Sequence, residues 1–178
     1  MPTVGYLVGS LAADSINRRL AGTLAELAPR SLRLVEIPLA GLPLYDRDVE
    51  DPVPAAVRSL KDAISACDAV LFVTPEHNRS VPAVLKNALD WASRPWGDNT
   101  WQGRRVAIIG SGLNGAGTAV AQAHLRAVLG YLGTLVMGAP EVCVPWREGV
   151  LELAETRTHL RGFLDALAAH AGATARAA

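Results

Sequence analysis

Residues 74–94 read TPEHNRSVPAVLKNALDWASR and follow the apolar run AVLFV at 69–73. Five apolar residues that end at Thr74-Pro75 are typical of a β-strand covered on both faces. The pattern after Pro82 predicts a helix of about three turns, with the proline near its first position. Open α/β sheets bind ligands just beyond the carboxyl ends of their strands. The polar segment Glu76-His77-Asn78, between this strand and this helix, is therefore the first candidate for a binding site.

The composition is that of a chain without a dominant charge. It has 178 residues, with 17 Lys and Arg against 17 Asp and Glu, so its net charge is zero when histidine is neutral. Proteins that bind nucleic acids or membrane surfaces usually carry an excess of positive charge, which this chain lacks. We therefore expect neither partner. The apolar runs are strand-length, far below the roughly 20 residues of a membrane span. We expect one domain over residues 1–178, with a frayed tail over 173–178.

Two local features bear on the compartment. The first ten residues, MPTVGYLVGS, lack the basic start of a signal peptide and run directly into a strand pattern. The only two cysteines, Cys67 and Cys143, are far apart and outside any CxxC spacing. We therefore expect a cytoplasmic protein without structural disulfides.

The rest of the chain predicts strands and helices in alternation. Besides 69–73, strands are expected over residues 4–8, 32–37, 106–110 and 134–137, the last with a possible continuation over 141–144. Helices are expected over about 15–28, 55–66, 83–94, 117–132 and 150–169. Five strands in such an alternation favour an α/β, flavodoxin-like three-layer sandwich with a five-stranded parallel sheet in the order 2-1-3-4-5. The loops after Val8, Val73 and Gly110 would then open onto one edge of the sheet. The proline-rich segment 38–54 would form a rim or an interface.

Two of these loops have residues suited to phosphate or to a flat ligand. Ser10, Ser15 and Asn17 lie at the start of a helix, where free N–H groups and the positive end of the dipole attract anions. The alternative is that Asp14 or Ser15 only caps this helix. Residues 110–115, GSGLNG, match the GxGxxG dinucleotide pattern. They follow the fourth strand rather than the first and lack the acidic residue about 20 positions on, so a tight turn beside a flat ligand is favoured.

The histidines give one catalytic candidate and no metal site. His77, in the loop after the third strand, could act as an acid or a base, although no serine or cysteine nucleophile has a recognisable relation to it. The other three histidines are scattered over two predicted helices without ligand spacing, so no metal is expected. Charged residues at every fourth position from Lys86 to Arg94 indicate a salt-bridged or interface stripe.

Three motifs resemble those of the NAD(P)H-dependent FMN reductases, whose relatives include quinone, chromate and azo-compound reductases. They are Gly9-Ser10 with Ser15-x-Asn17, the run Thr74-Pro75-Glu76-His77-Asn78-x-Ser80-x-Pro82 with LKNALDW at 85–91, and Ser111-Gly112 with Gly115-x-Gly117. The LPLY segment at 42–45 is also similar, and the resemblance extends from Val4 to about Pro140.

The resemblance implies a flavodoxin-like protein with FMN as cofactor and NADPH or NADH as co-substrate. It implies hydride transfer through the flavin to a quinone-like or other small acceptor, in a homodimer or homotetramer. The alternative is a flavin-binding electron carrier or a non-catalytic nucleotide-binding module, and the zero net charge argues against the carrier. The residues implied to bind FMN are Ser10, Ser15, Ile16 and Asn17 for the phosphate, Pro75, Glu76, His77, Asn78 and Ser80 for the ring and ribityl chain, and Ser111 and Gly112 for the opposite wall.

Three residues depart from the family pattern. Ala12 occupies a position where arginine is common, His77 one where tyrosine is common, and Ala83 one where glycine is usual. The missing charge-assisted hydrogen bond is worth about 1.5–3 kcal/mol. We therefore expect weak FMN binding unless Arg18 or Arg79 compensates.

Overall fold

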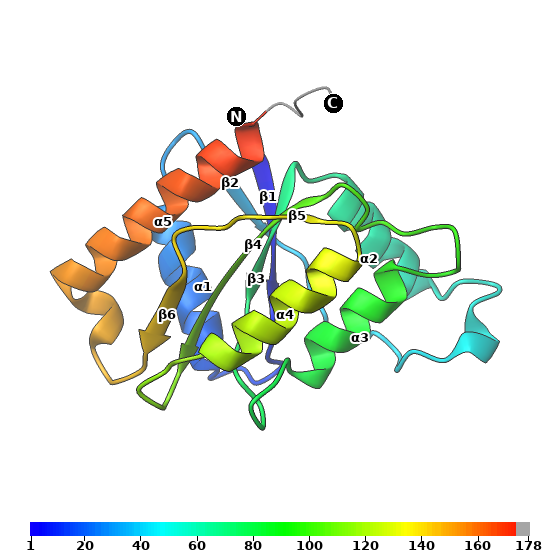
Figure 1. The fold of residues 1–178 in the computed structure, drawn as a ribbon, viewed down its shortest axis with the longest axis horizontal. Coiled ribbons are helices and arrows are strands. Elements are labelled where there is room, and N and C mark those ends of the chain that lie inside the picture. Colours follow the sequence, from blue (N-terminus) through cyan, green and yellow to red (C-terminus); the bar gives the residue numbers. More distant parts are fainter. Residues whose placement is uncertain (174–178) are drawn as a thin grey trace.

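The computed structural model describes residues 1–173 (Figure 1). Most of the predicted frayed tail, 173–178, therefore lies outside the described residues. The strands are β1 (Thr3–Val8), β2 (Arg33–Glu36), β3 (Ala69–Val73), β4 (Arg105–Gly112), β5 (Leu135–Val136) and β6 (Val142–Pro145). The helices are α1 (Ile16–Leu27), α2 (Ala55–Ser65), α3 (Ala83–Ala92), α4 (Ala119–Tyr131) and α5 (Ala154–Gly172), with short 3-10 helices at Arg47–Val49 and Val150–Glu152. Between residues 1 and 173, no helix has the length and apolar character needed to cross a membrane.

The strands form one parallel sheet in the order β2-β1-β3-β4-β5, and β6 also pairs with β4. This confirms the predicted flavodoxin-like fold class and strand order. β3 pairs with β1 on one side and with β4 on the other. All five of its residues are fully buried, as the unbroken apolar run at 69–73 predicts.

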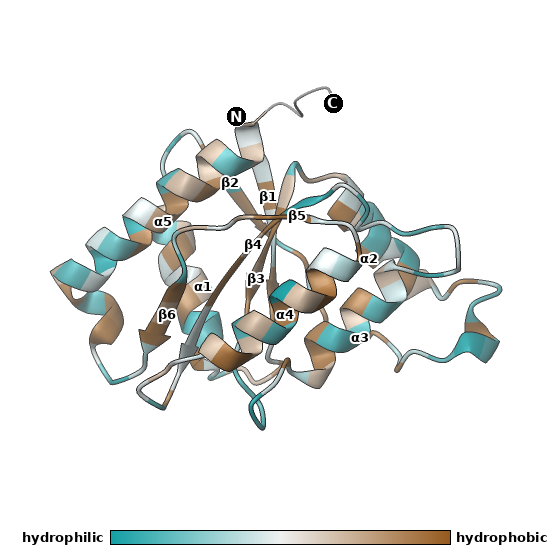
Figure 2. Ribbon diagram, viewed as in Figure 1, coloured by the Kyte–Doolittle hydropathy of each residue, from teal (hydrophilic) through white to brown (hydrophobic). Residues whose placement is uncertain are grey.

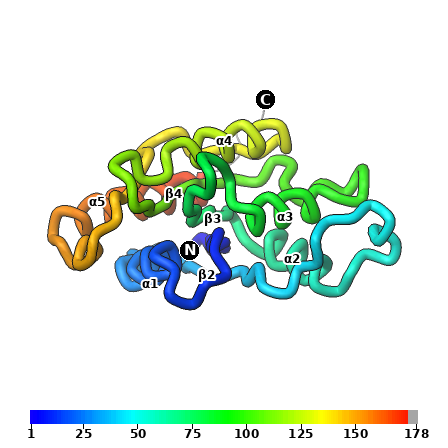
Figure 3. Tube along the Cα trace, turned by 90° about the horizontal axis from the view of Figure 1, so that it is seen from below, coloured from blue at the N-terminus to red at the C-terminus, as the bar shows by residue number. Residues whose placement is uncertain are grey.

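Two apolar cores lie on the two faces of the sheet (Figures 2 and 3). On one face, Leu20 and Leu24 of α1 pack with Phe163 of α5. On the other face, side chains of α2, α3 and α4 pack around the strands and Trp101. Figure 3 views the molecule from the end at which the strands finish, with α1 and α5 to the left and α2 and α3 to the right. The three loops with unusual composition meet at this end.

The edge beyond β4 differs from the prediction of one fifth strand. β5 pairs with the first residues of β4, and β6 pairs with its last four residues. Between them lies Gly138-Ala139-Pro140, and Pro140 has no N–H for a sheet ladder. The continuation that was left open therefore exists as a separate sixth strand.

Two predicted boundaries also change. The last helix begins at Ala154 rather than near Val150, because a 3-10 helix occupies Val150–Glu152. The fourth strand extends to Gly112 because β6 supplies partners for its end. Ser111 and Gly112, expected in a loop, are therefore strand residues, and their positions are set by sheet hydrogen bonds.

Candidate functional site

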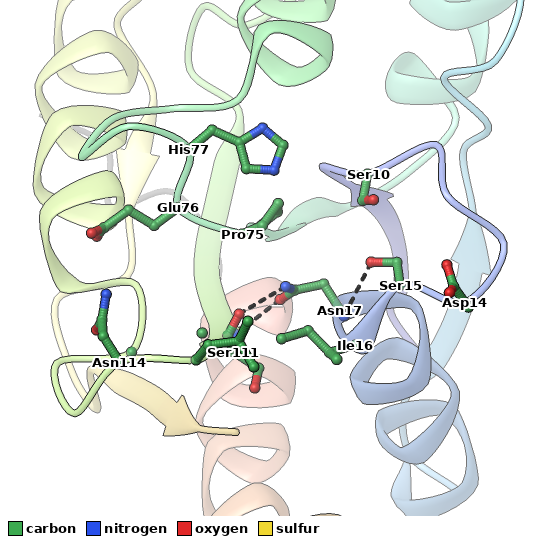
Figure 4. A pocket seen from close by; sticks show the side chains of 13 residues that line it. Ser10, Asp14, Ser15, Ile16, Asn17, Pro75, Glu76, His77, Ser111 and Asn114 are labelled. Atoms are coloured by element: carbon green, nitrogen blue, oxygen red, sulfur yellow. Dashed lines mark hydrogen bonds between the residues drawn. The ribbon is translucent and has the colours of Figure 1, made fainter. Parts of the chain in front are cut away.

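A pocket of about 560 Å³ lies where β1, β3 and β4 end (Figure 4). It is lined by Ser10, Asp14, Ser15, Ile16, Asn17, Pro75, Glu76, His77, Ser111, Gly112, Leu113, Asn114 and Gly117. The fold thus brings together residues from three segments that are far apart in the sequence. Of the predicted site residues, only Asn78 and Ser80 are outside this lining.

Four lining residues were not among the predicted cofactor contacts: Asp14, Leu113, Asn114 and Gly117. Asp14 had been considered only as a helix cap, and the other three belong to the segment that follows β4. The side chains of Leu113 and Asn114 carry no distinctive chemistry, and Gly117 has no side chain. These three residues reach the pocket because the chain turns back beside Gly112. Gly117 is itself part of the motif Ser111-Gly112 with Gly115-x-Gly117, and proximity to a recognised motif was the signal for the other three.

The first loop delivers the start of α1 to the pocket. Ser15 is the N-cap of this helix, and its side-chain oxygen accepts a 3.3 Å hydrogen bond from the Asn17 backbone N–H. Ser15 therefore caps the helix, as the alternative interpretation expected of Asp14 or Ser15. A serine hydroxyl also has one O–H to donate, so capping leaves Ser15 able to bind an anion. Ser10 is likewise partly exposed at the end of β1.

The second loop is a tight hairpin at the pocket mouth. His77 and Ser80 exchange two backbone hydrogen bonds of 3.1 and 2.9 Å. The two residues between them, Asn78 and Arg79, have φ angles of 49° and 62°. Positive φ at both central positions is typical of a type I′ turn, in which asparagine is a favoured residue. Asn78 thus forms the turn that presents the exposed His77 imidazole to the pocket.

Ser80 faces a second imidazole rather than the pocket. Its hydroxyl oxygen lies 3.1 Å from Nδ1 of His124, which is an exposed residue of α4. This contact explains why Ser80 is outside the lining although it belongs to the same motif.

The third segment is the end of β4 and the turn after it. Ser111 is fully buried, and its hydroxyl donates a 2.9 Å hydrogen bond to the carbonyl of Val144 in β6. A Cβ on Gly112 would lie 2.4 Å from the carbonyl oxygen of Gly117, so a side chain at position 112 would push this turn away. Gly112 therefore allows the chain to fold back tightly beside the pocket.

The dinucleotide interpretation of residues 110–115 finds no support in this packing. In that motif the third glycine permits close packing of helix on strand. Here a Cβ on Gly115 would meet nothing within 4 Å. The tight-turn interpretation is the one that agrees with the structure.

Glu76 is a buried carboxylate, 5% exposed at its side chain. One oxygen accepts hydrogen bonds of 3.1 Å from the backbone N–H groups of both Val120 and Ala121, at the start of α4. The other oxygen accepts one of 3.2 Å from Arg79. Figure 4 shows the carboxylate directed toward this helix and away from Ser15.

Positive charge at the pocket comes from the backbone. Within residues 1–173, no lysine or arginine side chain lines the pocket, while Asp14 and Glu76 do. Arg18 pairs with Glu36 at 2.8 Å, and Arg79 pairs with Glu76 at 3.2 Å. Both arginines are thus paired with glutamates, and neither is among the residues that line the pocket. Among the residues that line the pocket, the N-terminus of α1 supplies the positive potential beside Ser10 and Ser15.

The comparisons with known proteins agree on one family. The sequence model of the NADPH-dependent FMN reductase family matches residues 2–148. This chain belongs to that family. A 2-hydroxy-1,4-benzoquinone reductase of a Burkholderia species is 45% identical over 172 residues, which are 93% of this chain and 94% of the relative.

Solved structures give the same answer for the fold. FerB, a flavoenzyme NAD(P)H:(acceptor) oxidoreductase from Paracoccus denitrificans, matches with a TM-score of 0.91 at 39% identity, over 96% of this chain and 97% of FerB. A flavodoxin from Pseudomonas aeruginosa matches with a TM-score of 0.65 at 20% identity, over 96% of this chain and 99% of that one. The second match shows the shared flavodoxin-like fold.

The pocket of this family member fits FMN in size and chemistry. Its volume of about 560 Å³ is within the usual range for small-molecule sites. Hydroxyl groups and a helix N-terminus lie at one end, where a phosphate can be bound. Pro75 and Gly112, neither of which has a polar side chain, are also among the residues that line the pocket.

Proposed function

We propose that this protein is an FMN-dependent oxidoreductase that uses NADPH or NADH to reduce a quinone-like or other small acceptor. The observation that supports this most is the convergence of three loops of an FMN reductase family member on one pocket of suitable size. One relative is named for a quinone acceptor, as a 2-hydroxy-1,4-benzoquinone reductase, and FerB is named an NAD(P)H:(acceptor) oxidoreductase. We take residues 1–178 as a single FMN-binding domain.

The pocket residues fall into groups by what they can do. Ser10, Ser15 and the backbone N–H of Ile16 bind the phosphate, helped by the α1 dipole. Pro75 and His77 form one wall for the ring and ribityl chain, Asn78 and Ser80 hold the turn that carries His77, and Ser111 and Gly112 form the opposite wall. When bound, FMN supplies the hydride-accepting chemistry, which no side chain provides. The pocket residues would orient the ring, and the nicotinamide and then the acceptor would approach it from the open side of the pocket.

His77 remains the catalytic candidate. Reduction of a quinone to a hydroquinone requires protons as well as hydride, and an imidazole can hold and release a proton near neutral pH. The His77 side chain lines the pocket and is exposed to solvent, so it can be reprotonated between turnovers.

We also propose that a second copy of this chain covers the surface formed by α3 and α4, in a homodimer or homotetramer. Three apolar side chains on this side of the molecule, Leu44, Trp96 and Tyr131, are more than 80% exposed. Tyr131 also lines a cavity of about 620 Å³ beside Lys86 and Arg94. Exposed apolar side chains grouped in this way are typical of interfaces. Light scattering on the wild type and on a Trp96→Ser/Tyr131→Ser variant tests this, since only the variant should be monomeric.

We place this activity in the cytoplasm, where cysteines stay reduced. Cys67 and Cys143 are both free thiols, which agrees with that compartment. Tagging the protein and fractionating cells of its source tests this, and recovery in a secreted or periplasmic fraction would contradict it.

The decisive experiment measures flavin binding and turnover together. Purified protein is titrated with FMN, and NADH or NADPH oxidation is then followed without oxygen, with 1,4-benzoquinone as acceptor. The proposal predicts flavin binding and acceptor-dependent oxidation of at least one nucleotide. Flavin binding without nucleotide oxidation would instead favour the electron carrier. A protein that binds no flavin would contradict the proposed function as a whole.

A further inference from the structure

Asn17 and Glu76 belong to motifs that suggest contacts with FMN, yet both side chains are used inside the protein. We propose that they are positioning residues, which hold the three pocket segments in place before flavin binds. This inference rests on the proposed function, because it assumes that the pocket binds flavin. The phosphate would then be bound by Ser10, Ser15 and the Ile16 N–H, while Asn17 and Glu76 would hold the pocket segments whether or not a phosphate is present.

Asn17 joins the first loop to the end of β4. Its amide nitrogen donates a 2.8 Å hydrogen bond to the Ser111 carbonyl, and its oxygen accepts a 2.9 Å hydrogen bond from the Ser111 N–H. The two residues are 94 positions apart in the chain. Figure 4 shows this paired contact as two dashed lines at the floor of the pocket. Asn17 thus satisfies both backbone groups of one strand residue, as a neighbouring strand would.

Asn17 is more deeply buried than the other pocket residues at the start of α1. Asn17 is 0% exposed, whereas Ser10, Ser15 and Ile16 are partly exposed. Its oxygen and one of its amide hydrogens already have partners inside the protein. The phosphate is therefore left to the two serine hydroxyls and the Ile16 N–H. Loss of the Asn17 amide would leave two buried backbone groups of Ser111 without partners.

Glu76 joins the second loop to α4. The N-cap residue of α4, Thr118, makes no capping hydrogen bond with its side chain. Glu76 supplies that cap from another part of the chain through its bonds to Val120 and Ala121. A carboxylate at a helix N-terminus is also stabilised by the helix dipole. Because Arg79 of the same hairpin binds the second oxygen, the carboxylate fixes both the helix start and the turn.

Together the two side chains connect all three walls of the pocket. Asn17 ties α1 to β4, and Glu76 ties the hairpin after β3 to the helix that follows β4. A preformed pocket binds its ligand more tightly because less order must be imposed on binding. The benefit applies to the flavin ring whether or not a phosphate is present. Comparing a variant's affinity for FMN with its affinity for riboflavin, which has no phosphate, therefore distinguishes a positioning residue from a phosphate ligand.

The test measures two quantities for each variant and for the wild type. Fluorescence quenching gives the dissociation constants of FMN and riboflavin, and thermal unfolding gives the melting temperature of the flavin-free protein. Binding is measured at a temperature at which circular dichroism shows each variant to be folded. Asn17→Ala and Glu76→Gln should both melt at lower temperature than the wild type. Each should weaken FMN and riboflavin by about the same factor, on the order of 10-fold. Ser10→Ala is the matched control, since it should weaken FMN alone and leave melting unchanged.

Two results would overturn the inference. Selective loss of FMN binding by Asn17→Ala, with riboflavin binding and melting unchanged, would make Asn17 a phosphate ligand. Lower melting with unchanged affinity for both flavins would show that the contacts do not shape the pocket. If Asn17→Ala does not fold, Glu76→Gln carries the same test, because it keeps the size of the side chain.

If the wild type binds neither FMN nor riboflavin, the proposed function is contradicted, but the positioning roles of Asn17 and Glu76 are not. Hydrogen exchange of the flavin-free protein then decides the inference. Glu76→Gln should speed exchange at the Val120 and Ala121 amides relative to the wild type, and unchanged exchange there would overturn it.

Discussion

The side-chain oxygen of Asn87 accepts a 2.8 Å hydrogen bond from the backbone N–H of Tyr45. The amide nitrogen of Asn87 donates a second bond of 2.8 Å to the carbonyl of Pro43, which also accepts one from the Trp91 indole. α3 therefore holds the middle of the proline-rich segment 38–54 against the body of the protein. The segment predicted as a rim or an interface is thus anchored through its backbone by a neighbouring helix.

Asn87→Ala should lower the free energy of unfolding by about 1–3 kcal/mol, because it leaves the Tyr45 N–H without its partner. Urea unfolding measures this loss, and limited proteolysis should show new cleavage within 38–54. Lys86→Ala is the control on the same helix, since an exposed ion pair such as Lys86–Asp90 contributes about 0–1 kcal/mol. Equal effects of the two substitutions would contradict the proposed role of Asn87.

Ala12→Arg should bind FMN more tightly, by about 10- to 100-fold, because it supplies the charge-assisted hydrogen bond that Arg18 and Arg79 do not. Riboflavin affinity should stay unchanged, since it has no phosphate. The gain should shrink as salt is added, because part of it is electrostatic. Calorimetric titration with both flavins checks this. Similar tightening of FMN and riboflavin would show that residue 12 does not face the phosphate.

Substitutions of Asn78 test whether its backbone conformation stabilises the turn at the pocket mouth. Its φ of 49° suits asparagine and glycine but costs other residues about 1–2 kcal/mol. Asn78→Ala should therefore destabilise the protein by about 1 kcal/mol relative to Asn78→Gly, as measured by urea unfolding without flavin. Because the glycine variant keeps the turn and loses only the amide, its FMN affinity reports the side chain's own contribution. Equal stability of the two variants would rule out a backbone role.

His170 should make stability dependent on pH. Burial lowers the pKa of this imidazole below its ordinary value of 6.5, although a 3.0 Å contact with the Leu135 carbonyl opposes the shift. The unfolded chain therefore takes up the proton first, and stability falls as pH drops below about 6.5 until the folded pKa is passed. His170→Gln, which keeps an N–H donor, should reduce this loss. Urea unfolding at about pH 7.5 and about pH 5.5 compares the two proteins, and identical losses would exclude His170 as the source.

Local patterns were enough for the fold and for the position of the pocket. The apolar run at 69–73 could only be a strand covered on both faces, and alternation with helices then required a parallel sheet. The loop at 74–80 was recognised from its own residues, and the structure places it at the pocket. Such features are readable because strand burial, helix capping and turn chemistry depend on neighbours in the chain.

The partners of individual side chains needed the tertiary structure. No local pattern shows that Asn17 meets Ser111, 94 residues away, or that Glu76 meets Val120, 44 residues away. For β6, the sequence indicated a possible strand over 141–144, and the structure shows that it is separate from β5 and pairs with the end of β4. The sequence by itself therefore determined which segments surround the flavin pocket. Only the folded chain decided which of their polar groups face the pocket and which hold its walls together, because a buried polar group takes whatever partner the fold brings to it.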